Sequence, residues 1–240
     1  MARTRIIVNA DDFGQSKGIN SGILECYENG IVTSASVMVR YPDAIEAAYC
    51  ARNFPKFSLG LHVDLGEWRM VGGCWVPVYE VVSLVDHDAV HIEVNRQLQE
   101  FRRLMGRYPS HLDSHQHVHI KEPVRTVMIR LARQLAIPLR HFTREIEYCG
   151  AFYGQSTEGH SMPENVSSTR LVELLRAARG GVSEISCHPG RADDANTMYR
   201  GERAIEIEAL CNPRTFAAIA EQDVDLISFS DVKRVSISQQ

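Results

Sequence analysis

The sequence predicts an α/β fold, namely an irregular, TIM-like (β/α) barrel of about seven βα units in a single domain over residues 1–240. One observation behind this prediction is that short apolar runs alternate with longer segments of helical spacing, as expected around a parallel sheet. The other is the length of 240 residues, which suits one α/β barrel, with no repeat or linker that divides the chain. A doubly wound open sheet is the alternative, although no G-x-G-x-x-G follows the first apolar run.

Seven short apolar runs have the length and composition of strands. Segments of helical spacing separate most of them, so we expect the strands to pair in parallel. In chain order, the predicted strands are Arg5–Ala10, Ser34–Val39, Phe57–Val63, Ser110–Asp113, Ile137–Arg140, Ser183–Cys187 and Asp225–Phe229.

Helices are predicted between most of these strands, because apolar residues there recur every three to four positions. Glycines at Gly30 and Gly106 follow two of the apolar stripes, where helices commonly end. Asn212 and Pro213 are residue types favoured at the N-cap and the first position of a helix, and they precede the last one. The other apolar stripes lie within residues 19–27, 94–105, 127–135 and 171–178.

Two stretches lie outside the predicted strands and helices: residues 66–91, and residues 145–165, which are rich in glycine and aromatic residues and have no clear periodicity. We predict that both are loops over the functional site. Since loops carried on a rigid scaffold often supply binding residues, these stretches are expected to set substrate specificity.

The composition excludes several classes of protein. A net charge of -4 and a pI near 6.2 argue against a nucleic-acid partner, which requires a basic surface. No apolar run is long enough to span a bilayer, and the N-terminal residues do not resemble a signal peptide, so a cytoplasmic location is expected. The six cysteines are scattered without a C-x-x-C pair, which argues against a zinc ribbon or a thioredoxin motif.

Acids and histidines follow four of the predicted strands. In an α/β barrel, active sites form at this carboxyl end of the strands, so these side chains are expected to converge. Alone, an Asp-Asp pair is usually a loop or a helix N-cap, and a single histidine is usually structural. The residues concerned are Asp11 and Asp12 after the first strand, His62 and Asp64 after the third, residues 111–119 around the fourth, and His188 after the sixth.

The histidine run of residues 111–119 is different from the isolated histidines. Its acid and its histidines all fall on odd positions, so an extended chain would place them on one face. Four histidines on one face are unfavourable in a core, which favours metal binding. The isolated residues His87, His91, His141 and His160 are expected to be structural or surface histidines.

A set of one Asp and two His from three strands would leave positions open on a metal ion. Such an open set is typical of catalytic sites, whereas structural zinc sites are closed and rich in cysteine. A neighbouring aspartate is then available to take a proton from water, and His188 to protonate a leaving group. These groups suit metal-assisted hydrolysis of an amide.

Four segments together resemble the motifs of the YdjC-like carbohydrate deacetylase family, which includes chitooligosaccharide deacetylases and hopanoid-biosynthesis-associated deacetylases. The segments occur in family order, and the resemblance extends from Ile6 to about Asp231. They are Asn9–Gly14 (NADDFG), Gly60–Asp64 (GLHVD), His111–His119 (HLDSHQHVH) and Glu184–Gly190 (EISCHPG).

The resemblance implies an irregular (β/α) barrel, one divalent metal ion and hydrolytic removal of an N-acetyl group from a small amino-sugar substrate. At the matching positions, Asp12, His62 and His115 would bind the metal. Asp11 would be the general base and His188 the general acid. The family's metal is usually taken as magnesium, whereas two imidazoles favour zinc, manganese or nickel, so magnesium and zinc both stay open. A homodimer is a family-level expectation.

Neighbouring residues of the motifs have expected supporting roles. Asp64 and Asp113 are candidates for orienting the imidazoles. His117 and His119 are candidates for contacting substrate, and Gln116 is expected to face away.

Other functions stay open on the same residues. One is a metal-dependent phosphoester hydrolase or a sugar isomerase on a similar barrel, the former favouring two metals about 3.5–4 Å apart and more carboxylates. Another is a non-catalytic metal- or sugar-binding homologue. That reading predicts a missing base or acid, whereas Asp11 and His188 are both present.

Overall fold

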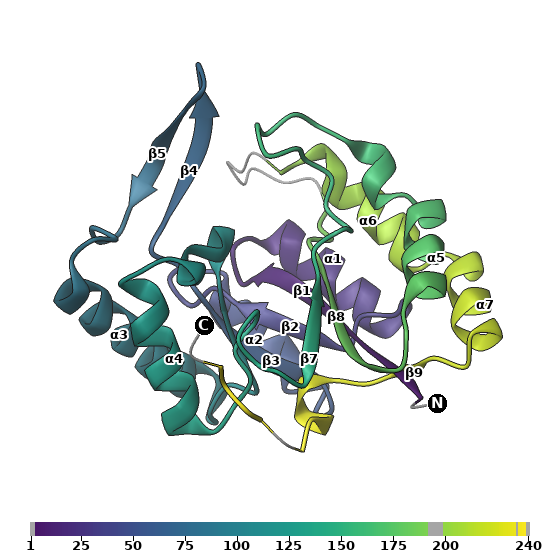
Figure 1. Cartoon of the computed structure of the whole chain (residues 1–240), viewed down its shortest axis with the longest axis horizontal. Helices are drawn as coiled ribbons and strands as arrows, with labels where there is room; N and C mark the ends of the chain where they lie inside the picture. Colours follow the sequence, from purple (N-terminus) through teal and green to yellow (C-terminus); the bar gives the residue numbers. More distant parts are fainter. Residues whose placement is uncertain (1–2, 192–198, 234, 239–240) are drawn as a thin grey trace.

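A curled parallel sheet forms the centre of the chain in the computed structural model, which describes residues 3–191, 199–233 and 235–238 (Figure 1). The short strand β9 (Asp225–Leu226) pairs with the beginning of β1. In sheet order, the other strands are β6 (Leu112–Ser114), β3 (Ser58–Val63), β2 (Ser34–Val37), β1 (Thr4–Phe13), β8 (Gly181–Cys187) and β7 (Ile146–Cys149).

Helices cover the outside of this sheet (Figure 1). Several begin at residue types that favour the N-cap: Ser16, Asp86 and Asn212, the last as predicted, each accept a backbone hydrogen bond from the first turn that follows. The helices are α1 (Lys17–Glu28), α2 (Ala44–Ala51), α3 (His87–Met105), α4 (Val124–Leu135), α5 (Ser168–Ala177), α6 (Gly201–Leu210) and α7 (Pro213–Glu221).

The core explains why β1 reads as a continuous apolar run. Ile6, Ile7 and Val8 are fully buried, although neighbouring strand residues point to opposite faces. Both faces of β1 are therefore covered, as expected for a central strand of a parallel sheet. This arrangement fixes the end of β1, where Asp11 and Asp12 lie.

The predicted α/β class is confirmed, but a complete barrel of about seven βα units is not. Among the described residues, no hydrogen-bonded pairing joins the two outer strands β6 and β7. The predicted strand Ile137–Arg140 contributes only an isolated bridge, between Leu139 and Leu112. Pro138 within that run has no N–H to donate, which limits its pairing. The structure is thus a curled parallel sheet of the half-barrel type.

The stretch predicted to be a loop at residues 66–91 contains an antiparallel hairpin. Its strands are β4 (Gly66–Val71) and β5 (Cys74–Glu80), and they project away from the sheet (Figure 1). At its base, the side-chain amide of Gln116 accepts a hydrogen bond from the Trp68 N–H at 2.9 Å and donates one to the Trp68 carbonyl at 2.8 Å. Gln116, which was expected to face away, therefore fastens the hairpin.

No helix formed by the described residues combines the length and the apolar composition that are needed to cross a lipid bilayer.

Candidate active site

The two adjacent acids at the end of β1 both reach one cluster of side chains. Regular strand geometry would point them to opposite faces. The pairing of β1 with β2 is irregular between Ala10 and Phe13, and Asp12 has a left-handed φ of 68°. Aspartate tolerates this conformation better than most residues, and such strain is concentrated at functional sites.

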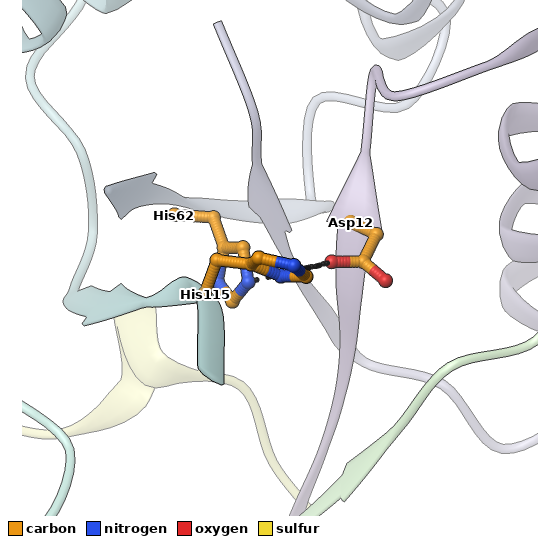
Figure 2. A group of neighbouring side chains, drawn as sticks. All are labelled: Asp12, His62 and His115. Atoms are coloured by element: carbon orange, nitrogen blue, oxygen red, sulfur yellow. Dashed lines mark ion pairs between the residues drawn. The ribbon is translucent and has the colours of Figure 1, made fainter. Parts of the chain in front are cut away.

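Asp12, His62 and His115 converge on one point, as Figure 2 shows. Asp12 Oδ1 lies 3.4 Å from His62 Nε2 and 3.3 Å from His115 Nδ1. This oxygen is buried and makes no hydrogen bond to any described residue. The other oxygen, Oδ2, accepts a hydrogen bond from Arg203 at 2.6 Å, which leaves Oδ1 to face the imidazoles.

The donor set fits a divalent cation. One carboxylate oxygen and two imidazole nitrogens lie within 4.8 Å of one another and come from three different segments. His62 Nδ1 is 2.8 Å from Asp113 Oδ1, and this bond directs Nε2 toward Asp12. Such a carboxylate behind a ligating histidine is the usual way in which a metal ligand is oriented. The expected contact of Asp113 with an imidazole is thus confirmed.

The expected role of Asp64 is wrong. Its carboxylate accepts hydrogen bonds from Arg40 at 2.7 Å and from Tyr79 at 2.9 Å, and it contacts neither imidazole. Asp64 therefore fastens β5 of the hairpin and Arg40 to the end of β3. On the hairpin itself, Glu67 Oε2 lies 3.6 Å from His115 Nε2.

The charges of the cluster favour a cation between Asp12 and the imidazoles. Burial by itself would raise the pKa of Asp12, but Arg203 and the two imidazoles hold it well below its usual value. Burial would lower the pKa of His62, but the carboxylates of Asp113 and Asp11 raise it well above its usual value. In the same way, Asp12 and Glu67 outweigh burial and raise the pKa of His115 to about 9.

Asp11 is held by a buried arginine. Arg140 donates to Asp11 Oδ2 at 2.7 Å and to Oδ1 at 2.8 Å, and the Asn9 amide donates to Oδ1 at 2.8 Å. The same guanidinium lies 2.9 Å from Asp113 and 2.6 Å from Glu184. Asp11, His62 and Asp113 form a second group of potential ligands, but Arg140 already supplies a positive charge there.

His188 lies at the end of β8 on the other side of Asp11. Its Nε2 is 3.7 Å from Asp11 Oδ2, and its Nδ1 is buried without a hydrogen-bond partner among the described residues. Burial lowers the pKa of His188 to about 4, so this ring is neutral at neutral pH. Its backbone N–H donates to Glu206, and Arg203 donates to its carbonyl at 3.1 Å.

The prediction that residues 111–119 share one face is wrong. Strand β6 ends at Ser114, and a 3-10 helix, η1 (His115–Ile120), follows with left-handed φ angles of 49° at Gln116 and 53° at His117. The chain therefore turns directly after the strand, and of the run's histidines only His115 reaches Asp12.

The other histidines of the run have structural partners. His111 contacts Ser36 at 2.9 Å and stacks on Phe229. His119 uses both nitrogens, on the Ser114 hydroxyl and the Arg140 carbonyl, which contradicts its expected contact with substrate. His117 pairs with His141 at 2.9 Å and stays partly exposed.

The five predicted site residues lie in one cluster, but three further members were not predicted. Arg140 and Arg203 neutralise the two aspartates, and Glu67 approaches His115. Arg140 ends a predicted strand, as the acids and histidines do, so its place in the sequence could have indicated that it lies in the site. Arg203 lies on α6 and Glu67 on β4, two elements that the sequence pattern did not reveal.

A family model described as YdjC-like protein matches residues 5–221. A chitooligosaccharide deacetylase of Serratia marcescens is 32% identical over 257 residues, covering 95% of this chain and 98% of the relative. A carbohydrate deacetylase of Geobacillus stearothermophilus is also 32% identical, covering 94% of this chain and 96% of the relative.

Solved structures share the fold. A proposed cellobiose-phosphate cleavage protein from Enterococcus faecalis V583 matches with a TM-score of 0.78 at 26% identity, covering 95% of this chain and 98% of the other. A family 4 carbohydrate esterase from Streptomyces lividans, in complex with acetate, matches with a TM-score of 0.58 at 11% identity over 100% of both chains. At that identity the second likeness concerns the fold alone.

Proposed function

Because the chain belongs to the YdjC-like protein family, we propose that it is a metal-dependent hydrolase that removes an N-acetyl group from a small amino-sugar substrate. The relatives that cover nearly the whole chain are a chitooligosaccharide deacetylase and a carbohydrate deacetylase, which supports this reaction class. The observation that carries the proposal is the buried Asp12 Oδ1, which accepts no hydrogen bond from the described residues and lies between two imidazole nitrogens, with the carboxylate group of Asp11 beside it.

Asp12, His62 and His115 would hold the metal ion. A divalent cation bound there would polarise the amide carbonyl and make a water molecule more acidic. Arg203 keeps Asp12 ionised, and Asp113 keeps His62 turned toward the same point. Two imidazoles and one carboxylate favour zinc over magnesium as the ion, on grounds of ligand softness.

Asp11 is proposed as the general base. Its two hydrogen bonds from Arg140 fix the direction of its carboxyl group. Asp11 would accept a proton from the water that attacks the acyl carbon, which is the role of a positioned carboxylate in general base catalysis. The carbon–oxygen bond forms at this stage.

His188 is proposed as the acid that protonates the leaving nitrogen. Because its pKa is lowered to about 4, the ring starts neutral and must first receive a proton. Asp11 Oδ2, at 3.7 Å, is the nearest carboxylate oxygen from which Nε2 can take it. Transfer from His188 to the nitrogen lets the carbon–nitrogen bond break and yields acetate and a free amine.

The arrangement around Arg140 disfavours phosphoester hydrolysis by two metal ions. The second ligand group, Asp11, His62 and Asp113, surrounds a place where the guanidinium already supplies the charge. A second ion there would have to displace a buried arginine that is paired with three carboxylates. Breaking a buried ion pair costs about 3–5 kcal/mol.

Acetate release tests the proposal directly. Chelated protein would be reloaded with zinc, magnesium, manganese or nickel and incubated with N-acetylated chito-oligosaccharides and, in a parallel arm, with an aryl phosphate. We expect acetate release only after reloading, and no phosphate release. The His115→Gln variant should be inactive, whereas His160→Gln, which alters an exposed histidine, should match the unaltered protein. Full acetate release by the chelated protein would refute the metal requirement.

A further inference from the structure

An exposed aromatic ring lies directly beside His188. Tyr153 belongs to the segment between β7 and α5 and is 39% exposed. Its ring centroid is 5.4 Å from that of His188, with an angle of 64° between the planes. At this exposure, part of Tyr153 stays accessible to solvent although the ring contacts the proposed acid.

The structure holds this ring firmly. Tyr153 stacks on Tyr199, with centroids 5.0 Å apart and planes at 16°, and Tyr199 is only 6% exposed. The Gly154 N–H donates to the Tyr199 hydroxyl at 2.8 Å, and that hydroxyl donates to Glu206. Since Glu206 also accepts the backbone N–H of His188, one carboxyl group positions both the ring stack and the proposed acid.

Gly154 brings the segment against α6. A Cβ atom at this position would lie 2.7 Å from Glu202 Cγ and 2.9 Å from the Tyr199 hydroxyl, so only glycine permits this approach. Tyr153 is therefore fixed relative to α6, which also carries Arg203, the partner of Asp12. The ring of Tyr153 and the group of Asp12, His62 and His115 are therefore parts of one packed unit.

We propose that Tyr153 is the stacking surface for the pyranose ring that carries the acylated nitrogen. This inference rests on the proposed function. If His188 protonates the leaving nitrogen, the sugar carbon bonded to that nitrogen must lie beside His188. In a cyclic 2-amino sugar this carbon is part of a pyranose ring, whose C–H groups pack well against the electron-rich face of a tyrosine.

The hydroxyl of Tyr153 adds a polar contact at the same place. Burial and the negative charge of Asp12 raise the pKa of Tyr153 above its usual value, so the phenol stays neutral. A neutral phenol both donates and accepts hydrogen bonds, as sugar hydroxyls do. Binding sites for small polar molecules commonly combine an aromatic wall with a few such polar groups.

A pair of matched substrates tests the stacking. The ring-closed substrate is the methyl glycoside of N-acetylglucosamine, and the open-chain substrate is N-acetylglucosaminitol, which has the same acetamide but no pyranose ring. We expect Tyr153→Ala to raise KM for the methyl glycoside about five- to tenfold, the size of one aromatic contact, with kcat changed less than about twofold. KM for the open-chain substrate should not change. Tyr153→Trp should restore the preference, and Phe216→Ala, which removes a ring of 40% exposure on α7, should behave as the unaltered protein.

A binding assay separates this proposal from the proposed function. Isothermal titration of the two sugars into chelated protein requires no turnover, so it remains informative if no acetate is released. Weaker binding of the methyl glycoside by Tyr153→Ala than by the unaltered protein supports the stacking. Equal binding, an equal loss for both sugars, or no preference of the unaltered protein for the ring overturns it. If Tyr153→Ala unfolds, Tyr153→Leu replaces it in both assays, with thermal unfolding as the check.

Discussion

Two groups of histidines, His62 with His115 and His117 with His119 and His141, have opposite electrostatic surroundings. Near Asp12, carboxylates raise the pKa of His62 well above its usual value and that of His115 to about 9, against the effect of burial. On the far side of Arg140, burial, with a contribution from this guanidinium, lowers the pKa of His119 to about 3 and that of His141 to about 4. His115 and His119 are only four residues apart.

The difference shows that neighbouring charge, and not membership of a histidine-rich motif, decides what a histidine can do. The two imidazoles near Asp12 attract positive charge, so a metal ion can replace their protons. The second group, His117, His119 and His141, stays neutral and pairs with hydroxyls, a carbonyl and one another. That group supports the backbone around Arg140.

Removal of the Asp12 carboxylate should remove the charge that distinguishes His62 and His115 from the other histidines. In Asp12→Ala, the imidazoles lose the charge that aligns them, and Arg203 is left without its partner. We expect metal binding to be lost and acetate release to fall to the level of chelated protein. Metal content after dialysis and acetate assays check this, with circular dichroism as the control for folding. Retention of a stoichiometric metal ion would contradict the ligand assignment.

Neutralising Asp11 should affect turnover while metal binding remains. Asp11→Asn keeps the shape of the side chain but removes the proton acceptor, so kcat is expected to fall by about 10²–10⁴-fold. Metal affinity should stay close to that of the unaltered protein, because Asp11 is separated from the cation position by its pairing with Arg140. Calorimetric titration with metal and initial-rate measurements check the two expectations. Normal turnover in this variant would refute the base assignment.

Rising pH should strengthen metal binding because it removes protons from His62 and His115. The pKa of each is raised above the usual 6.5 in the folded protein, so both are protonated near neutral pH and must lose a proton to bind a metal. The dissociation constant should therefore fall about tenfold per pH unit for each proton displaced, between about pH 6.5 and 8.5. Titrations in buffers of different ionisation enthalpy count the released protons. An affinity that is independent of pH over this range would exclude the displacement.

Substitution in the second histidine group should have the smallest effect. His117→Gln removes the contact with His141. Because no carboxylate among the described residues pairs with His117, metal affinity should stay within about twofold. The free energy of unfolding should fall by about 1 kcal/mol, the value of one hydrogen bond. Metal titration and thermal unfolding measure these two quantities. The matched variant His115→Gln should lose metal binding. Equal losses in both variants would mean that the two groups are not distinct.

The sequence predicted the cluster of Asp11, Asp12, His62, His115 and His188 because each member stands at the carboxyl end of a strand. Asp12, His62 and His188 follow buried apolar runs, so their convergence required only the parallel order of the strands. The turn after Ser114 was not predictable in the same way. Left-handed φ angles at Gln116 and His117 leave no mark on hydrophobic periodicity, although they decide which histidine faces Asp12.

The β4–β5 hairpin, β7 and α6 were not predicted because their hydrophobic patterns or cap residues are weak. The β4–β5 hairpin is exposed over much of its length, so its strands have no consistent apolar face. Of the four residues of β7, Ile146 alone is buried, and no side-chain cap begins α6. Arg203 and Glu206 on α6 were therefore missed, although they support Asp12 and His188.

The hairpin also has a practical consequence for engineering. Gln116 and Asp64 anchor its base, whereas its tip is the exposed pair Gly72 and Gly73, with φ angles of 59° and 82° that suit a tight two-residue turn. A Cβ at either glycine would meet no atom within 4 Å. Length added or removed in whole cross-strand pairs would thus leave His115 in place, which makes this tip an insertion point for a fluorophore or a fused partner.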